Sequence, residues 1–495
     1  MLNRKHINTL SLLLTATMMI SMTACSNRDE KNTDTSASTS ASETEPDGSE
    51  SEDAESESSA PKSTGSLTTD EEISNSGDGE HAIEADGKTA SYSNVHVTKT
   101  GDSEEGDEAD FYGDNAAIFA TNGATLDLSD IVVDTDGKHA NAVFSYGEGT
   151  TVNIRNSEIR TSGNCSGGLM TTGGGTMNAE NLTIHTTGNS SAAIRSDRGG
   201  GTVNVTGGSY TTDGKGSPVI YSTADITVND AKMESTSSQG VVVEGRNSVT
   251  LNNVTLVADN NSKNSDKSSW YQAVMIYQSM SGDAKEGEAS FSMKDGSLVN
   301  KNGDIFFVNN TVTTITLENV EITNQDSEGV FLRAAAAGWG SEGSNGGKVN
   351  LILKNQKQDG DILVDSVSAV NMYLTSGSNY QGAINPDNEG KVYVEIESGS
   401  KWILSGDSYV TSLTCNADAI DLNGHTLYVN GVAYSEGTAS TGEAITLVTE
   451  SSSDRSKGGP EGGKHEAPPS GEKPKGDPPS GKKPNGDPPS FSESA

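Results

Sequence analysis

The chain is short of aromatic residues and of positive charge. Phe, Trp and Tyr make up 5% of its 495 residues, and 33 basic side chains stand against 70 acidic ones, a formal net charge of −37. A nucleic-acid-binding protein needs basic surface to displace the counterions of phosphates, so this balance excludes nucleic acid as a partner. Apolar residues are also scarce, at 31%, which is low for one large compact core. We therefore expect a narrow, elongated core together with unfolded segments.

A long apolar run is present only at the extreme N-terminus, which excludes a polytopic membrane protein. Residues 1–24 have a basic start and a mostly apolar centre, as in a signal peptide. Met22-Thr23-Ala24-Cys25 then resembles the lipobox of bacterial lipoproteins. The resemblance implies a lipid on Cys25 that anchors an extracytoplasmic protein to the cell membrane, exposed at the cell surface. An ordinary secretory signal with a chance cysteine is the alternative.

Two segments lack the apolar residues that folding needs. Residues 25–75 are rich in Ser, Thr, Asp and Glu, and we expect a disordered acidic tether there. Residues 451–495 are rich in Pro, Gly, Ser and Lys, and Pro-Pro-Ser recurs every ten residues from Pro468. We expect an extended, disordered tail, which acts as a spacer or as a ligand for cell-wall polymer or a partner protein.

Residues 76–450 contain an internal repeat. Short apolar segments begin at Ala117, Ala142, Gly168, Ala193 and Pro218, at intervals of 25, 26, 25 and 25 residues. In each unit a second alternating segment, a turn and a third segment follow. Three short strands per unit of this length, without a helical period, predict an all-β parallel β-helix whose coils stack about 4.8 Å apart.

One position of the turn is always Asn, Asp or Gly, the residue types that tolerate a left-handed backbone. It is occupied by Asn94, Asp130, Asn156, Asn181, Gly207, Asp230, Asn253, Asp295 and Asn319. The period, the aliphatic columns and this turn position resemble the right-handed parallel β-helices of the pectate-lyase-like superfamily. The resemblance implies a solenoid fold but leaves function open, because lyases, hydrolases, tailspikes and adhesins share that fold.

The chain has two cysteines beyond the signal segment, Cys165 and Cys415, which are 250 residues apart. A disulfide requires Cα atoms within about 7 Å of each other, and these positions fall many coils apart. We therefore expect two unpaired cysteines in the core.

The first strand of each unit has an aliphatic residue that must face the core, so that the next residue must face outward. The expected inward residues are Ile83, Ile118, Val143, Leu169, Ile194, Val219, Val242, Val274, Ile305 and Val330. The expected outward residues are Glu84, Phe119, Phe144, Met170, Arg195, Ile220, Val243, Met275, Phe306 and Phe331. An outer face this apolar is either covered by loops or binds a ligand, with Phe119, Phe144 and Met170 among the candidate contacts.

Insertions interrupt the repeat at about 100–115, 259–272, 280–288 and 334–347, and two of them carry tryptophan. Trp270, with its neighbour Tyr271, and Trp339 are suited to stacking on the apolar face of a sugar ring. The alternative is that each tryptophan attaches its own loop to the sheet.

The first insertion is dense in carboxylates, which are the oxygen ligands that Ca²⁺ prefers. Asp102, Glu104, Glu105, Asp107 and Asp110 are therefore candidate metal ligands, although their spacing is not that of an EF-hand. The alternative is a simply solvated acidic loop. Calcium is the one cofactor that the sequence suggests.

Arg195, Asp197 and Arg198 form the tightest charged cluster on the first strands. Enzymes of the family that the chain resembles use a basic residue or grouped carboxylates on the outer face, so these three are the catalytic candidates. The alternative is a surface ion pair. We expect a non-catalytic lipoprotein rod that acts in adhesion or carbohydrate binding. A polysaccharide lyase or glycoside hydrolase, and a passive stalk, are the alternatives.

Overall fold

The computed structural model describes residues 67–448 except positions 107 and 264. The signal segment, Cys25, most of the expected tether and the C-terminal tail lie outside the described residues. The end of the expected tether is corrected, because Glu71–Asn75 forms a strand, β1, that pairs with β4 (Val95–Lys99). Among the residues that the structure describes, no helix has the length and apolar character needed to cross a membrane.

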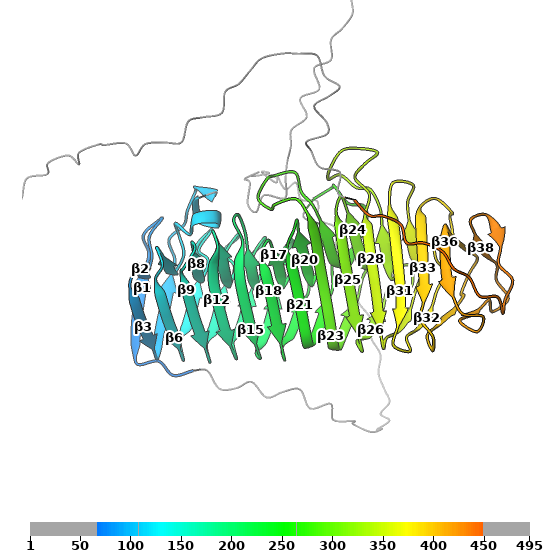
Figure 1. Cartoon of the computed structure of the whole chain (residues 1–495). Coiled ribbons are helices and arrows are strands. Elements are labelled where there is room, and N and C mark those ends of the chain that lie inside the picture. The colour runs from blue at the N-terminus through cyan, green and yellow to red at the C-terminus, as the bar shows by residue number, and fades with distance from the viewer. Residues whose placement is uncertain (1–66, 107, 264, 449–495) are drawn as a thin grey trace, which may run out of the picture. The chain divides into compact units, whose positions relative to one another are not determined.

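The predicted parallel β-helix is confirmed (Figure 1). An eleven-stranded sheet collects the first strand of most coils, and a twenty-one-stranded sheet collects the second and third strands of most coils. All strand pairs are parallel except the hairpin that joins the last two strands.

The eleven-stranded sheet contains β2 (Ile83–Asp86), β5 (Ile118–Thr121), β8 (Val143–Tyr146), β11 (Leu169–Thr172), β14 (Ile194–Ser196), β17 (Ile220–Ser222), β20 (Val241–Glu244), β22 (Gln272–Tyr277), β24 (Asp304–Asn309), β27 (Leu332–Ala334) and β30 (Ile362–Val364). The twenty-one-stranded sheet contains β1 (Glu71–Asn75), β3 (Thr89–Ser93), β4 (Val95–Lys99), β6 (Thr125–Ser129), β7 (Val132–Thr135), β9 (Thr151–Arg155), β10 (Glu158–Thr161), β12 (Gly175–Glu180), β13 (Thr183–Thr186), β15 (Gly201–Thr206), β16 (Ser209–Thr212), β18 (Asp225–Asn229), β19 (Lys232–Ser235), β21 (Ser248–Ala258), β23 (Glu288–Asn300), β25 (Val312–Glu318), β26 (Glu321–Asn324), β28 (Lys348–Lys354), β31 (Ala369–Thr375), β33 (Lys391–Ile396) and β36 (Ser412–Cys415). Near the C-terminal end, two smaller sheets contain β29 (Lys357–Asp359), β32 (Asn379–Gln381), β34 (Lys401–Ile403) and β37 (Ile420–Asp421), and β35 (Ser408–Val410), β38 (Leu427–Val429) and β39 (Val432–Ala433).

The predicted left-handed turn position is confirmed at all nine residues, whose φ angles lie between 48° and 70°. Their side chains also pair between coils. Asn181 donates a hydrogen bond to Asn156 at 3.0 Å, and Asn253 donates one to Asp230 at 2.7 Å. The turn residues therefore fix the backbone of each coil and its stacking on the coil before it.

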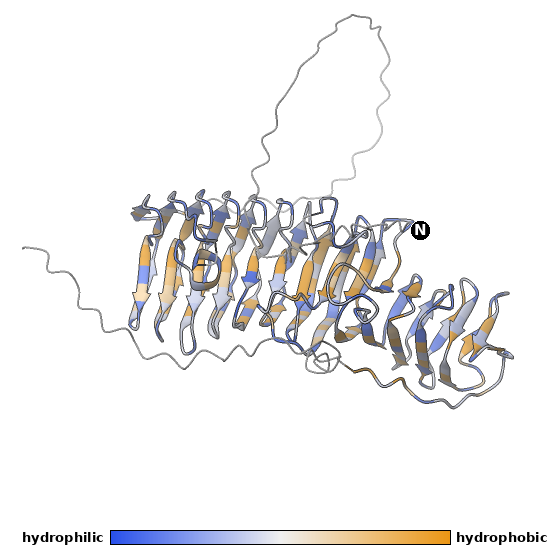
Figure 2. Cartoon of the chain, turned by 90° about the horizontal axis from the view of Figure 1, so that it is seen from above, coloured by the Kyte–Doolittle hydropathy of each residue, from blue (hydrophilic) through white to orange (hydrophobic). Residues whose placement is uncertain are grey.

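The core is a narrow column of aliphatic side chains that runs the length of the coils. Figure 2 shows apolar residues along the strands, whereas the connecting turns are mostly polar. The low apolar content of the chain is sufficient because a coil of three short strands encloses few side chains.

The expected alternation on the first strands is correct in the N-terminal coils and again at Val274 and Met275, and it is wrong in the other coils after Ile194. Ile118, Val143, Leu169 and Ile194 align in the inward column as expected. The column then continues through Ile220, Val241, Val274, Phe306 and Leu332. Ile220, Val243, Phe306 and Phe331, which were expected to face outward, belong to the core instead. The coil from Ile194 to Ile220 has one residue more than assumed, and a shift of one residue exchanges the two faces of a strand.

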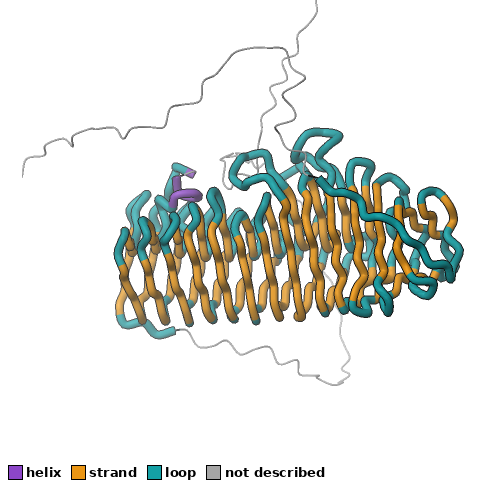
Figure 3. Tube along the Cα trace, in the orientation of Figure 1, coloured by secondary structure: helices purple, strands orange, loops and turns teal. Residues whose placement is uncertain are grey.

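The insertions lie at the ends of the strands of the eleven-stranded sheet, on one side of the coils. The opposite side has short turns (Figure 3). The first insertion, between β4 and β5, contains η1 (Glu108–Tyr112), the one helical element among the described residues. The loops before and after β22, and the loop after β27, are the others. The long connections therefore rise beside the outer face of one sheet.

Cys415 is buried and its thiol is free, so no bridge joins it to Cys165. Cys165 is disulfide-bonded, which corrects the expectation of an unpaired thiol at that position.

Candidate functional site

The outward column of the eleven-stranded sheet changes character along the coils. It begins with Glu84 and three apolar residues, Phe119, Phe144 and Met170. Arg195 and Tyr221 follow on β14 and β17, and Val242, Met275 and Phe307 continue it on β20, β22 and β24. The column therefore contains a charged and phenolic section between two apolar sections.

The first apolar section is covered by the first insertion. Phe144 and Met170 are fully buried and Phe119 is 8% exposed. The backbone of Gly113 lies on the Phe119 ring, because a Cβ added there would meet the ring at 2.5 Å. The ring of Tyr112 packs edge-on against Tyr146, with centroids 5.8 Å apart. Phe119, Phe144 and Met170 therefore attach a loop and do not line an open groove.

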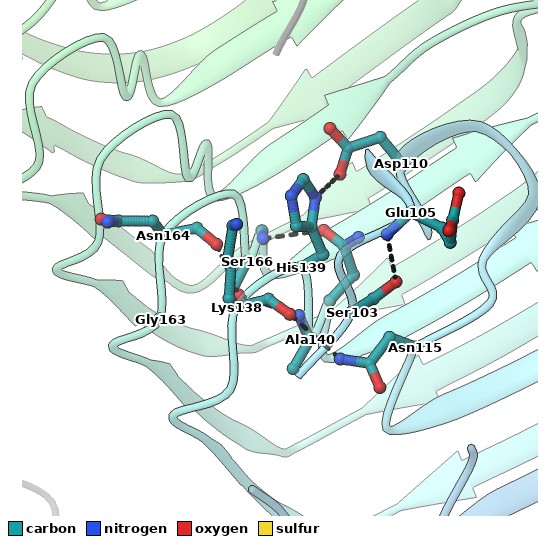
Figure 4. Close-up of polar contacts among 12 residues, drawn as sticks. Ser103, Glu105, Asp110, Asn115, Lys138, His139, Ala140, Gly163, Asn164 and Ser166 are labelled. Carbon is teal, nitrogen blue, oxygen red and sulfur yellow. Dashed lines mark hydrogen bonds and ion pairs between the residues drawn. The ribbon is translucent and has the colours of Figure 1, made fainter. Parts of the chain in front are cut away.

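The attachment of this loop is also polar. Asp110 and His139 point toward each other (Figure 4), with Asp110 Oδ1 2.9 Å from His139 Nδ1 and both side chains 1% exposed. Asp110 Oδ2 lies 3.6 Å from Nη2 of Arg195, also buried. The loop thus inserts a carboxylate between a histidine of the next coil and the arginine of the outward column.

The other candidate calcium ligands do not converge. Asp102 accepts a hydrogen bond from the backbone of Lys138, and Glu104 forms an ion pair with the Lys138 side chain at 3.2 Å. The backbone amide of Glu105 donates to Ser103, as Figure 4 also shows. Asp107 lies outside the described residues. Within 67–106, 108–263 and 265–448, no group of three or more His, Cys, Asp or Glu side chains is arranged to hold a metal ion.

Two of the three candidate catalytic residues lie together. Arg195 Nη2 lies 2.8 Å from Asp197 Oδ2, and both side chains are buried, so this is not a surface ion pair. Burial raises the pKa of Asp197 to about 6, although Arg195 acts in the opposite direction. Burial alone would lower the pKa of Arg195, but Asp110 and Asp197 outweigh it and raise that pKa above its usual value.

Arg198 has a different role. Its guanidinium lies 3.8 Å above the ring of Phe111 in the first insertion, and it donates two hydrogen bonds to Asp283 at 2.8 and 3.0 Å. It therefore joins two insertions that are far apart in the sequence.

A pocket opens over the charged section of the outward column. It encloses about 770 Å³ of empty space, counting the part that opens to solvent. Its lining includes Arg195, Asp197, Tyr221, Val242, Trp270, Gln272, Met275 and Trp339. The sheet supplies the floor, and the insertions before β22 and after β27 supply the tryptophans.

The two tryptophans differ in their exposure. Trp339 is 2% exposed and packs edge-on against Tyr277, with centroids 5.2 Å apart. Trp270 is half-buried, 5.5 Å from the Phe307 ring and 4.8 Å from the guanidinium of Arg333. Both therefore hold their loops to the sheet while they line the pocket. Tyr271 is directed elsewhere and contacts Lys263, 4.8 Å from its ring.

Three residues of the lining have buried polar atoms without a hydrogen-bond partner in the described part of the chain. These atoms are Arg195 Nη1, Gln272 Oε1 and Trp339 Nε1. A buried polar atom that lacks a partner costs about 1–3 kcal/mol. Two donors and one acceptor thus belong to residues that line one aromatic-walled pocket, which is the composition of a site for a small polar ligand.

Glu244 was not predicted to belong to the site. Tyr221 and Tyr277 both donate hydrogen bonds to Glu244 Oε2, the second at 2.9 Å. The carboxyl is 2% exposed, and burial raises its pKa even though hydroxyl donors, Ser279 first among them, lower it. The correct register would have identified Tyr221 and Glu244, because it places Tyr221 outward on β17 and Glu244 two residues after the outward Val242.

Fold and site together define a parallel β-helix with a buried, charged pocket on the outer face of one sheet. No protein-family model, no curated protein and no solved structure matches the chain.

Proposed function

We propose that this protein is a lipid-anchored surface protein whose β-helix binds glycan in the pocket between Trp270 and Trp339. The observation that carries the proposal is the set of three buried polar atoms without partners in the pocket lining. A sugar has hydroxyl groups that both donate and accept, and an apolar C–H face that packs on aromatic rings. Such a ligand would satisfy Arg195, Gln272 and Trp339 together.

The apolar residues of the outward column are buried, as the passive stalk predicts. The feature that supports binding over a stalk is the pocket that Arg195 and Tyr221 line between the two apolar sections. We also propose that the chain is related to the pectate-lyase-like superfamily that its sequence resembles. Binding in the pocket would serve adhesion to glycan-bearing surfaces or to cell-wall polymer.

The binding proposal is tested on a glycan array with the purified full-length protein. We expect binding that Trp270→Ala weakens at least about fivefold, because an aromatic wall of a sugar site contributes on the order of 1 kcal/mol or more. Tyr271→Ala is the matched control, since its ring is adjacent in sequence but outside the pocket. Absence of binding to any glycan, or equal binding by the Trp270→Ala variant, would support the stalk.

The anchor is proposed from Met22-Thr23-Ala24-Cys25 alone. Mass spectrometry of the mature N-terminal peptide is expected to show a lipid-modified Cys25, and Cys25→Ala is expected to release the protein from the membrane fraction. A Cys25 without lipid, whether as a thiol or in a disulfide, would contradict the anchor.

A further inference from the structure

The floor of the pocket holds a phenol hydrogen-bonded to a buried carboxylate. Tyr221 is the less buried member of the pair, and its hydroxyl donates to Glu244 Oε2 and lies 3.2 Å from the hydroxyl of Tyr277. Glu244 Oε1 has no hydrogen-bond partner among the described residues. A hydroxyl nucleophile hydrogen-bonded to a carboxylate base is the basic unit of covalent catalysis.

A second carboxyl lies on the same wall. Asp197 lines the pocket and lies two residues after the outward Arg195, so that it faces the same side. Glu244 lies two residues after the outward Val242 in the same way. The two acidic residues therefore occupy one column and are separated by two coils, about 10 Å between their backbones at the spacing of parallel strands. Tyr221 lies on the coil between them.

The third element is the cation. Arg195 is the Cα partner of Tyr221 on the neighbouring strand, and its Nη1 is buried without a partner among the described residues. Asp110 and Asp197 hold the other side of the guanidinium. One nitrogen thus remains to bind an anionic group of a ligand beside the Tyr221 hydroxyl.

We propose that the pocket hydrolyses glycosides of sugar acids whose carboxylate is attached to the anomeric carbon, with Tyr221 as nucleophile, Glu244 as its base and Asp197 as general acid. The inference rests on the proposed glycan site. A neutral phenol suits this substrate class because a carboxylate nucleophile would be repelled by the carboxylate next to the reacting carbon. Arg195 would bind that substrate carboxylate.

The first step transfers the sugar to the enzyme. Tyr221 Oη forms a bond to the anomeric carbon while Glu244 takes the phenolic proton. The bond from that carbon to the leaving oxygen breaks, its electron pair remains on the oxygen, and Asp197 donates a proton to it.

The second step releases the sugar. Asp197, now ionised, takes a proton from a water molecule whose oxygen attacks the anomeric carbon. The bond to Tyr221 breaks, and Glu244 returns its proton to the phenolate. The sum is glycoside and water to free sugar and alcohol, with no change of oxidation state.

The environment of each group is consistent with its role. Burial raises the pKa of Asp197 to about 6, so that a fraction of this carboxyl is protonated near neutral pH. Burial also raises the pKa of Tyr221, so that the phenol keeps its proton until the base removes it.

The test uses the full-length protein and the methylumbelliferyl glycoside of N-acetylneuraminic acid, with the corresponding glucoside as the neutral comparison. We expect release of methylumbelliferone from the acidic glycoside, and kcat at least about 100-fold lower in Tyr221→Phe, since nucleophile and base then no longer act together. Tyr146→Phe is the matched control, because its ring lies on the same outer face within the covered section. It is expected to retain wild-type kcat.

Asp197→Asn tests the role of Asp197 as general acid through the dependence of activity on the leaving group. A structural role of Asp197 would not produce such a dependence. Methylumbelliferone is a good leaving group that needs little protonation, so the variant is expected to lose less activity on it than on an alkyl glycoside of the same sugar. The alkaline limb of the pH profile should disappear as well.

Each outcome has a defined meaning. No release from the acidic glycoside, or equal kcat in Tyr221→Phe, overturns the catalytic proposal. Glycan binding that depends on Trp270 would then still stand by itself. Equal cleavage of the glucoside overturns the acidic substrate class.

Discussion

Asp110 Oδ1 lies 2.9 Å from His139 Nδ1, and each side chain is only 1% exposed. This pair attaches the first insertion to the second coil of the apolar section and places Asp110 beside Arg195. The acidic loop thus supplies a structural carboxylate to the site.

Removal of Asp110 is expected to be strongly destabilising. Asp110→Ala leaves His139 and Arg195 buried without their shared partner, and breaking a buried pair costs about 3–5 kcal/mol. Glu104→Ala on the same loop is the control, since the Glu104 side chain is 76% exposed and such pairs contribute at most about 1 kcal/mol. Urea unfolding of both variants measures the difference, and equal losses would contradict this role for Asp110.

The burial of Asp197 predicts a pH dependence of stability. Its pKa is raised to about 6 from 3.8, so the folded state holds the proton more tightly than the unfolded state. The contribution is fully present below pH 3.8 and is lost as the pH rises through about 6. The unfolding free energy of the wild type relative to Asp197→Asn should therefore fall over this interval. A constant difference in urea titrations would show that Asp197 ionises normally, and a rising one would show that the ion pair with Arg195 lowers its pKa.

Arg198 is expected to hold two insertions together. Arg198→Lys keeps the charge but loses the planar contact with Phe111 and the paired hydrogen bonds to Asp283. Hydrogen exchange should become faster in 108–112 and in 279–287, with little change in Tm. Arg155→Lys, at an exposed arginine on β9, should leave both segments as they are. Unchanged exchange in Arg198→Lys would mean that other contacts hold the loops.

The turn position at Asn181 tests the backbone contribution. Its φ is 53°, a conformation that costs an ordinary side chain about 1–2 kcal/mol. Asn181→Ala should lower the unfolding free energy by about that amount, while Asn181→Gly should recover most of it, as Gly207 occupies the same position in the next coil. If both variants lose equally in urea unfolding, the hydrogen bond to Asn156 is the main contribution.

The sequence by itself determined the solenoid. Three patterns that can be recognised in short stretches of sequence indicate a β-helix coil. They are a period near 25 residues, an aliphatic residue in each first strand, and an Asn, Asp or Gly at each turn. The turn prediction was correct at all nine positions because positive φ is a requirement on a single residue.

Only the tertiary structure decided which residues form the site. Val219 and Ile220 are both aliphatic, so hydropathy could not choose between them, yet the choice sets the face of the residues that follow. This one-residue ambiguity concealed Tyr221 and Glu244. The partners of Asp110, and the difference between Trp270 and Tyr271, depend on contacts between segments distant in the chain. Such contacts arise from coil stacking and loop packing, and no local pattern encodes them.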